Sequence, residues 1–79
     1  MSNLEKYNNI FMENFEVNEN MLNEDFDNEN VSKWDSVAHM NLITMLEDEF
    51  DIFFESEDIM EFNSYSKGKE ILKKYNIEL

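Results

Sequence analysis

The residues most able to do chemistry are Asp35, Ser36 and His39, which lie within five positions of one another. A serine, a histidine and an acid can support nucleophilic catalysis, but that chemistry also needs an oxyanion hole. No loop that could form one is evident, and because the only glycine, Gly68, stands alone, there is no glycine-rich loop to cradle a phosphate either. A serine at the start of a helix can instead anchor an anionic group, because the free N–H groups and the helix dipole favour negative charge there. We therefore interpret Ser36 as an attachment point rather than a nucleophile.

Residues 36–50 are expected to form an amphipathic helix that begins at Ser36, with Asp35 or Ser36 as its N-cap. Its core side gathers His39, Leu42, Ile43, Leu46 and Phe50. The opposite side carries Val37, Asn41, Thr44 and Asp48, flanked by Met40, Met45 and Glu47. An apolar Val37 on the solvent side, next to the serine, indicates a docking contact. We thus predict a partner-binding surface at Val37, Asn41, Thr44, Glu47 and Asp48.

Three further helices are predicted from apolar spacing and capping residues. Residues 3–15 form a stripe of Leu4, Tyr7, Phe11 and Phe15, and Ser2 with Glu5 matches a capping box. A short helix over residues 56–61 would turn Ile59 and Met60 inward, and a helix over 65–75 would bury Tyr65, Ile71, Leu72 and Tyr75. The sequence therefore predicts an all-α, four-helix bundle that forms a single domain over residues 1–79.

The two connections that flank the serine-bearing helix are predicted to be held down by apolar side chains. Residues 16–35 form a long loop, which needs such anchors, and the candidates are Met21, Leu22, Phe26 and Val31. In residues 51–55 the apolar Ile52, Phe53 and Phe54 are expected to fill the core. Asp25, Asp27 and Glu29 only loosely resemble the start of a calcium loop, which also needs a glycine and a later glutamate. We interpret this segment as a solvated acidic loop.

Composition narrows the function classes. Six lysines, no arginine and nineteen acids give a net charge of −13, which would repel nucleic acid and anionic membranes and favour partners with basic patches. With 42% hydrophobic and 14% aromatic residues the chain should nevertheless fold. The absence of cysteine and the single histidine argue against a metal site. No signal peptide or membrane span is evident, so we expect a cytoplasmic monomer without membrane insertion.

The segment 34–52 resembles the acyl carrier protein family. The resemblance rests on Trp34-Asp35-Ser36-Val37, on Leu42, and on the acidic helix end Leu46-Glu47-Asp48-Glu49-Phe50-Asp51-Ile52. It extends to the length and helix order of nearly the whole chain and is weak in the first helix. It implies a 4′-phosphopantetheine arm on Ser36, next to Asp35, installed from coenzyme A by a phosphopantetheinyl transferase. Such a carrier is not an enzyme; it presents acyl groups, as thioesters, to synthase, ligase or acyl-transferring enzymes.

The sequence departs from the family pattern close to the serine. Lys33 and Trp34 replace a common Gly-Ala pair, and two positions that are often acidic are Ala38 and Asn41. These changes favour a carrier for a specialised pathway over one for general fatty-acid synthesis, and a peptidyl or aminoacyl carrier remains an alternative. In the resembling family the acyl chain can enter the bundle, and the methionines Met21, Met40, Met45 and Met60 could line such a space or simply fill the core.

Two other classes stay open at this level. One is an acidic protein-interaction module that uses its charge without being modified. The other, a more distant alternative, is a hydrolase in which His39 activates Ser36.

The charge leads to a prediction about stability. Nineteen acids on 79 residues should repel one another in the folded state, and salt screens such repulsion. We expect moderate NaCl or a divalent cation to raise the melting temperature, measured by circular dichroism. A melting temperature that stays flat or falls with added salt would contradict this.

Overall fold

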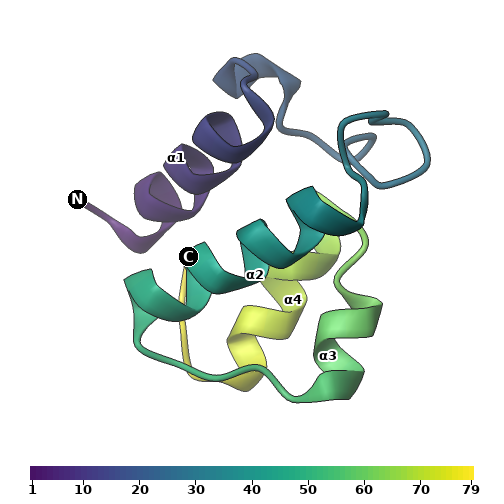
Figure 1. Cartoon of the computed structure of the whole chain (residues 1–79). Coiled ribbons are helices and arrows are strands. Elements are labelled where there is room, and N and C mark those ends of the chain that lie inside the picture. The colour runs from purple at the N-terminus through teal and green to yellow at the C-terminus, as the bar shows by residue number, and fades with distance from the viewer.

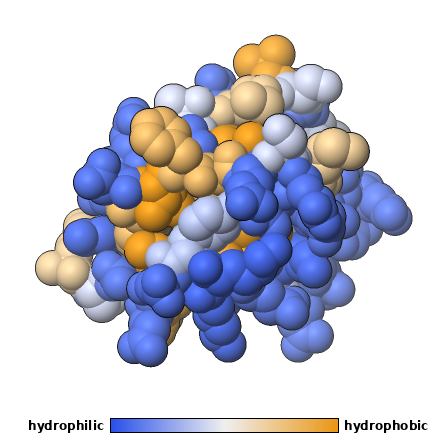
Figure 2. All heavy atoms as spheres, turned by 90° about the horizontal axis from the view of Figure 1, so that it is seen from below, coloured by the Kyte–Doolittle hydropathy of each residue, from blue (hydrophilic) through white to orange (hydrophobic).

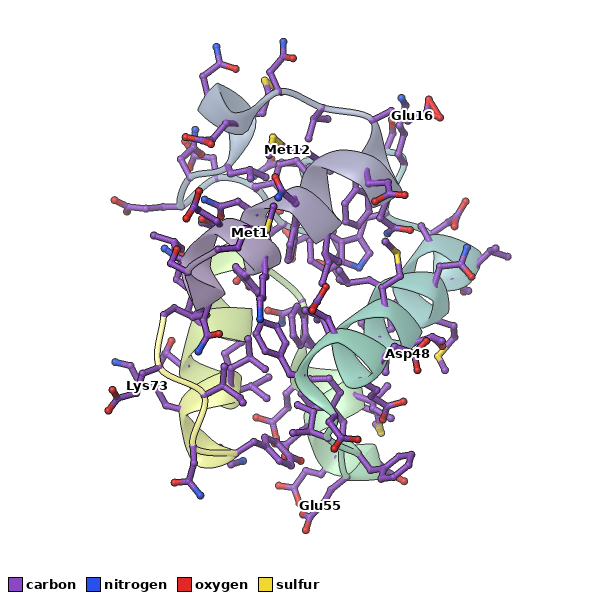
Figure 3. The ribbon with its side chains drawn as sticks, turned by 90° about the vertical axis from the view of Figure 1, so that its left-hand side faces the viewer. Met1, Met12, Glu16, Asp48, Glu55 and Lys73 are labelled. Carbon is purple, nitrogen blue, oxygen red and sulfur yellow. The ribbon has the colours of Figure 1, made fainter.

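Helix α1 begins and ends where local capping dictates. In the computed structural model, which describes all 79 residues, it spans Asn3–Phe15. The Ser2 hydroxyl accepts a hydrogen bond from the Glu5 amide (3.1 Å), and the Glu5 carboxylate accepts one from the Ser2 amide (3.0 Å), so the expected capping box is present. The helix ends at Phe15, and its C-cap, Glu16, has a left-handed φ of 56° (Figure 3 labels Glu16). The buried side is Tyr7, Ile10, Phe11 and Phe15.

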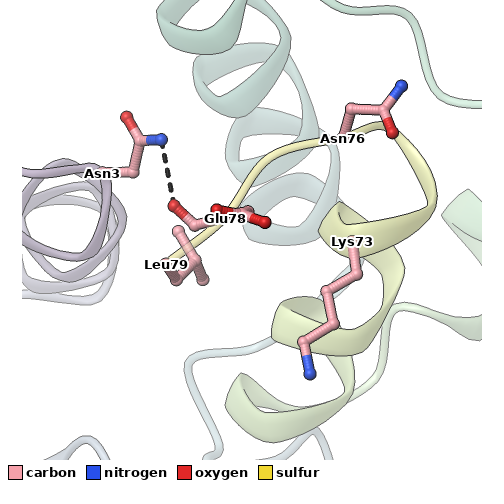
Figure 4. A pocket seen from close by; sticks show the side chains of 5 residues that line it. All are labelled: Asn3, Lys73, Asn76, Glu78 and Leu79. Atoms are coloured by element: carbon pink, nitrogen blue, oxygen red, sulfur yellow. Dashed lines mark hydrogen bonds between the residues drawn. The ribbon is translucent and has the colours of Figure 1, made fainter.

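Three more helices complete an all-α bundle, as the sequence predicted. They are α2 (Ser36–Phe50), α3 (Ser56–Glu61) and α4 (Tyr65–Lys74), and a short 3₁₀ turn at Glu19–Met21 interrupts the long loop. In Figure 1 the ribbon of α2 runs between α1 above and α3 and α4 below. The two ends of the chain lie side by side, and the Asn3 side chain donates a hydrogen bond to the carbonyl of Glu78 at 3.0 Å (Figure 4).

The loop between α1 and α2 is held down by two aromatic side chains. Phe26 and Trp34 are both buried, and their rings pack with those of Phe11 and Phe15. The backbone adds two hydrogen bonds from the loop to the start of α4, from the Tyr65 amide to the carbonyl of Phe26 (2.9 Å) and from the amide of residue 28 to the carbonyl of residue 63 (3.0 Å). Twenty residues without a regular helix or strand are thereby tied to the bundle.

Several predicted core residues lie elsewhere. Met21, predicted to anchor the loop, is 51% exposed, whereas Leu22 and Val31 are half-buried against the core. Leu4 lies in the first turn of α1, where it is also exposed. Phe50 is only half-buried, near the end of α2.

Two further residues that were predicted to lie in the core are exposed: Phe53 in the connector (86% exposed) and Met60 in α3 (81% exposed). Burial alternates along the connector: Ile52 and Phe54 face the core, so Phe53 between them faces solvent. In α3, a helix of six residues, Asp58 is buried and Ile59 half-buried, and Met60 is turned to the outside.

A buried acid holds α3 to the end of α4. Asp58 is 2% exposed, and its two carboxylate oxygens accept hydrogen bonds from the Lys74 ammonium and the Tyr75 hydroxyl, both at 2.6 Å. The Tyr75 hydroxyl in turn accepts from the Glu55 amide at 2.9 Å. The Lys74 hydrogen bond holds the pKa of Asp58 below its ordinary value. Since burial alone would favour the neutral acid, these two donors keep a buried carboxylate charged.

The single glycine, Gly68, makes room for two aromatic side chains against α4. Gly68 is buried in α4, and a Cβ atom there would overlap the hydroxyl of Tyr7 and the ring of Phe62. Both rings are completely buried, so neither has room to retreat. The Tyr7 hydroxyl also donates to the carbonyl of Tyr65 at 2.6 Å, which fixes its position. Glycine is therefore required here for close packing, with α1 and α4 in contact.

Gly68→Ala should destabilise the protein although alanine is the better helix former. The propensity gain is at most about 1 kcal/mol, whereas overpacking a filled core costs about 1–3 kcal/mol. We expect a net loss of unfolding free energy in urea titrations. Ser66→Ala, at an exposed position of the same helix, is the matched control and should be neutral or slightly stabilising. Equal stability of the two variants would show that the contact at Gly68 is loose.

Candidate functional site

The start of α2 separates a capping residue from a free hydroxyl. Asp35 is the N-cap, and its carboxylate accepts a hydrogen bond from the Ala38 amide at 2.8 Å. Ser36 is the first helical residue; it is exposed, and its hydroxyl makes no hydrogen bond within the chain. Of the two candidate caps, Asp35 thus does the capping, which leaves the Ser36 oxygen available for other chemistry.

The position of this helix start is fixed from the side of α1. The Asn14 side chain donates to the carbonyl of Ala38 at 3.1 Å. Two residues before the serine, Trp34 is buried against Phe11 and Phe15 of the same helix, with ring centroids 5.9 and 5.0 Å away. An exposed serine therefore follows a segment that packing and hydrogen bonding hold in place.

His39 connects three parts of the chain. Its Nδ1 atom accepts a hydrogen bond from the Trp34 indole N–H at 3.0 Å, and its Nε2 atom lies 2.8 Å from the carbonyl oxygen of Ile59 in α3. Because an indole N–H can only donate and a carbonyl can only accept, these contacts assign the acceptor role to Nδ1 and the donor role to Nε2. Both nitrogens are committed to these partners, and neither is hydrogen-bonded to Ser36.

A shallow hollow of about 660 Å³ lies beside the serine. It runs between the first turns of α2 and the end of α3, and its walls include Trp34, Ser36, His39, Met40, Met60 and Phe62. Met40 and Met60 are both largely exposed and contribute flexible thioether side chains. A second hollow, of about 730 Å³, lies between the two chain ends among mostly polar residues, and it shares no residue with the first (Figure 4).

The exposed side of α2 carries an apolar residue beside the serine and an acid toward its far end. Val37 is 71% exposed, and Asn41, Thr44 and Asp48 are also exposed along α2; Figure 3 labels Asp48. Glu47 differs from these, because its carboxylate accepts a hydrogen bond from the Phe54 amide at 2.9 Å and so fixes the connector. On the face seen from below, Figure 2 shows apolar residues gathered left of centre, with further single ones toward the edges of a mostly hydrophilic surface.

Two other features of the chain bear on possible sites. In the acidic loop, the Asp27 carboxylate accepts from the amides of Glu29 (3.0 Å) and Asn30 (2.8 Å), so this acid closes a turn. None of the four helices has the length and apolar character that a bilayer span requires.

Sequence reasoning missed two components of this site. Met60 was expected inside, yet it forms a wall of the hollow. The partners of His39 were also missed: periodicity places this residue on the inner side of α2, but a backbone carbonyl from another helix leaves no signal in the sequence. The pair of Trp34 and His39, five residues apart and both able to hydrogen-bond, was the one available sign.

Comparison with models of known protein families gives no match to this chain. A search of curated proteins likewise finds no significant relative.

Proposed function

We propose that this protein is a carrier of acyl groups, held as thioesters on a 4′-phosphopantetheine arm attached to Ser36. The observation that carries the proposal is the state of that serine: exposed, free of hydrogen bonds, and first in a helix whose cap is supplied by Asp35. The resemblance of residues 34–52 to acyl carrier proteins supports the same assignment. A carrier catalyses nothing itself, and the chain's only histidine is already committed elsewhere.

The residues present suit the proposed group. In the attachment reaction the Ser36 oxygen forms a bond to phosphorus, the anhydride bond of coenzyme A breaks, adenosine bisphosphate leaves, and the serine proton passes to a base of the transferase. The resulting phosphodiester is an anion at the positive end of the α2 dipole. The hollow beside Ser36 offers Met40 and Met60 as apolar contacts for the arm. The thiol of the arm would supply the thioester chemistry.

The same surface suits recognition by basic partner enzymes. Val37 offers an exposed apolar contact one residue from Ser36, and Asn41, Thr44 and Asp48 continue the exposed side of α2. The net charge of −13 would speed encounter with a basic patch. Ala38 and Asn41 leave the first turns of α2 without acids, which favours partners of a specialised acyl pathway. An aminoacyl or peptidyl carrier uses the same attachment and remains the alternative within this class.

One competing class draws support from a specific observation. Val37, Met60 and Phe53 are large apolar residues with more than two thirds of their surface exposed on an acidic protein, which would also suit an interaction module that is never modified. The hydrolase interpretation is disfavoured, because neither nitrogen of His39 is hydrogen-bonded to Ser36, and to accept the serine proton the ring would have to give up at least the hydrogen bond from Trp34.

Intact mass spectrometry tests the attachment. After incubation with coenzyme A, Mg²⁺ and a broad-specificity phosphopantetheinyl transferase, the wild-type chain should gain the mass of one phosphopantetheine. Ser36→Ala should gain nothing, while Ser32→Ala, a matched change at an exposed loop serine, should be modified like wild type. No gain by the wild-type chain with several transferases would favour the unmodified interaction module.

Val37→Asp separates docking from folding. Val37 is exposed in the first turn of α2, where an acid also interacts favourably with the helix dipole, so the unfolding free energy should change by less than about 0.5 kcal/mol. The modification rate at limiting carrier concentration should fall, because an apolar contact beside Ser36 is lost. A large drop in melting temperature would show that Val37 has a role in the fold. An unchanged rate would remove it from the docking surface.

A further inference from the structure

The last turn of α3 has backbone carbonyl groups that need hydrogen-bond donors from outside the helix. In a helix of six residues, Ser56–Glu61, the carbonyl groups of the last four residues have no partner within the helix. One of them, the carbonyl of Ile59, accepts the hydrogen bond from His39 Nε2 at 2.8 Å. His39 lies in the first turns of α2, so a side chain of α2 donates a hydrogen bond to the last turn of α3.

This contact joins the two walls of the hollow beside Ser36. Met40 on α2 follows His39 directly, and Met60 on α3 follows Ile59 directly. The bond between His39 and Ile59 therefore connects the backbone segments that carry the two methionines. Trp34 is itself packed in the core. Its indole N–H donates to His39 Nδ1 at 3.0 Å and so fixes the orientation of the histidine ring.

We propose that His39 is a positioning residue that holds the end of α3 at a set distance from Ser36 and so shapes the hollow where the prosthetic arm leaves the protein. This inference rests on the proposed function and deepens it. His39 does not touch the reacting oxygen: it determines where Met60 lies, and through Met60 it determines the surface that a transferase or acyl enzyme meets. Its loss should weaken recognition of the carrier and leave the reactivity of the serine unchanged.

Steady-state phosphopantetheinylation tests this with three chains. His39→Phe keeps a planar ring and removes both hydrogen bonds. His39→Gln keeps an acceptor and a donor and is the rescue variant. For His39→Phe we expect KM for the carrier to rise roughly fivefold to tenfold, the effect of losing the one hydrogen bond that reaches α3, to the Ile59 carbonyl, while kcat stays within about twofold of wild type. His39→Gln should recover most of the loss. Glu70→Gln, at an exposed position of α4, is the control and should match wild type.

Two structural measurements read the contact directly and do not require modification. Trp34 is the only tryptophan, so its indole N–H gives one NMR resonance, which should move upfield when His39 no longer accepts its proton. Amide hydrogen exchange in α3 should quicken in His39→Phe and return toward wild type in His39→Gln. If His39→Phe fails to fold, His39→Asn takes its place, because its shorter amide cannot reach both partners.

The outcomes separate the two proposals. A KM that stays within about twofold of wild type in His39→Phe, or a loss that falls on kcat alone, overturns the positioning role. Equal losses in His39→Phe and His39→Gln overturn it as well, because hydrogen bonding would then be irrelevant. A wild-type chain that no transferase modifies overturns the carrier function instead. The indole resonance and α3 exchange then decide the role of His39: unchanged values in His39→Phe overturn it.

Discussion

The structure depends on one ring, that of Phe11. Its centroid lies 4.9–6.4 Å from the centroids of six other aromatic rings, those of Tyr7, Phe15, Phe26, Trp34, Phe62 and Tyr65. These rings come from α1, the long loop, the segment after α3 and the start of α4. A chain of 79 residues has only a small core, and burial of that core must outweigh the self-repulsion of a net charge of −13. Each large aromatic ring buries much apolar area, so such rings build a core from few residues.

The same cluster places the serine. The chain has no disulfide and no proline to stiffen residues 16–35, so the order of this loop depends on Phe26 and Trp34 in the core. Trp34 does this two residues before Ser36, and its indole N–H also orients His39. The serine is therefore exposed while the two residues before it are fixed: Trp34 by packing and Asp35 by capping. The proposed arm on Ser36 would need this combination, because it could move freely only about an attachment point that is itself fixed.

Helix boundaries were predictable because they depend on local chemistry. Ser2, Asp35 and Ser64 each accept a hydrogen bond from an amide three residues ahead, so α1, α2 and α4 begin where sequence signals place them. Burial was less predictable where an element is short. A single turn of helix or a five-residue connector has no repeating pattern, so Met60 and Phe53 look like core residues until the neighbours that displace them are known.

The candidate site likewise has features that local sequence predicts and features that it does not. The free Ser36 and the exposed Val37 follow from helix phase and capping, both of which are local. Contacts made at a distance were invisible: the carbonyl of Ile59 on His39, and the rings of Tyr7 and Phe62 against Gly68. A lone glycine in a helix and a lone histidine on its inner side are ambiguous in a sequence, because their roles belong to the opposing helix.

The exposure of Met60 beside the serine has its cause on the far side of α3. Asp58 is directed toward α4 by Lys74 and Tyr75, and Ile59 lies partly buried against the core. Successive residues of a helix point about 100° apart, so once Asp58 and Ile59 are turned inward Met60 must face away from the core. A buried acid paired with α4 thus turns Met60 toward solvent, while the proposed role of His39 is to set how far this turn of α3 lies from Ser36. Apolar exposure at this point is a consequence of how α3 is fastened, and it places a flexible side chain where an arm and a partner would both meet it.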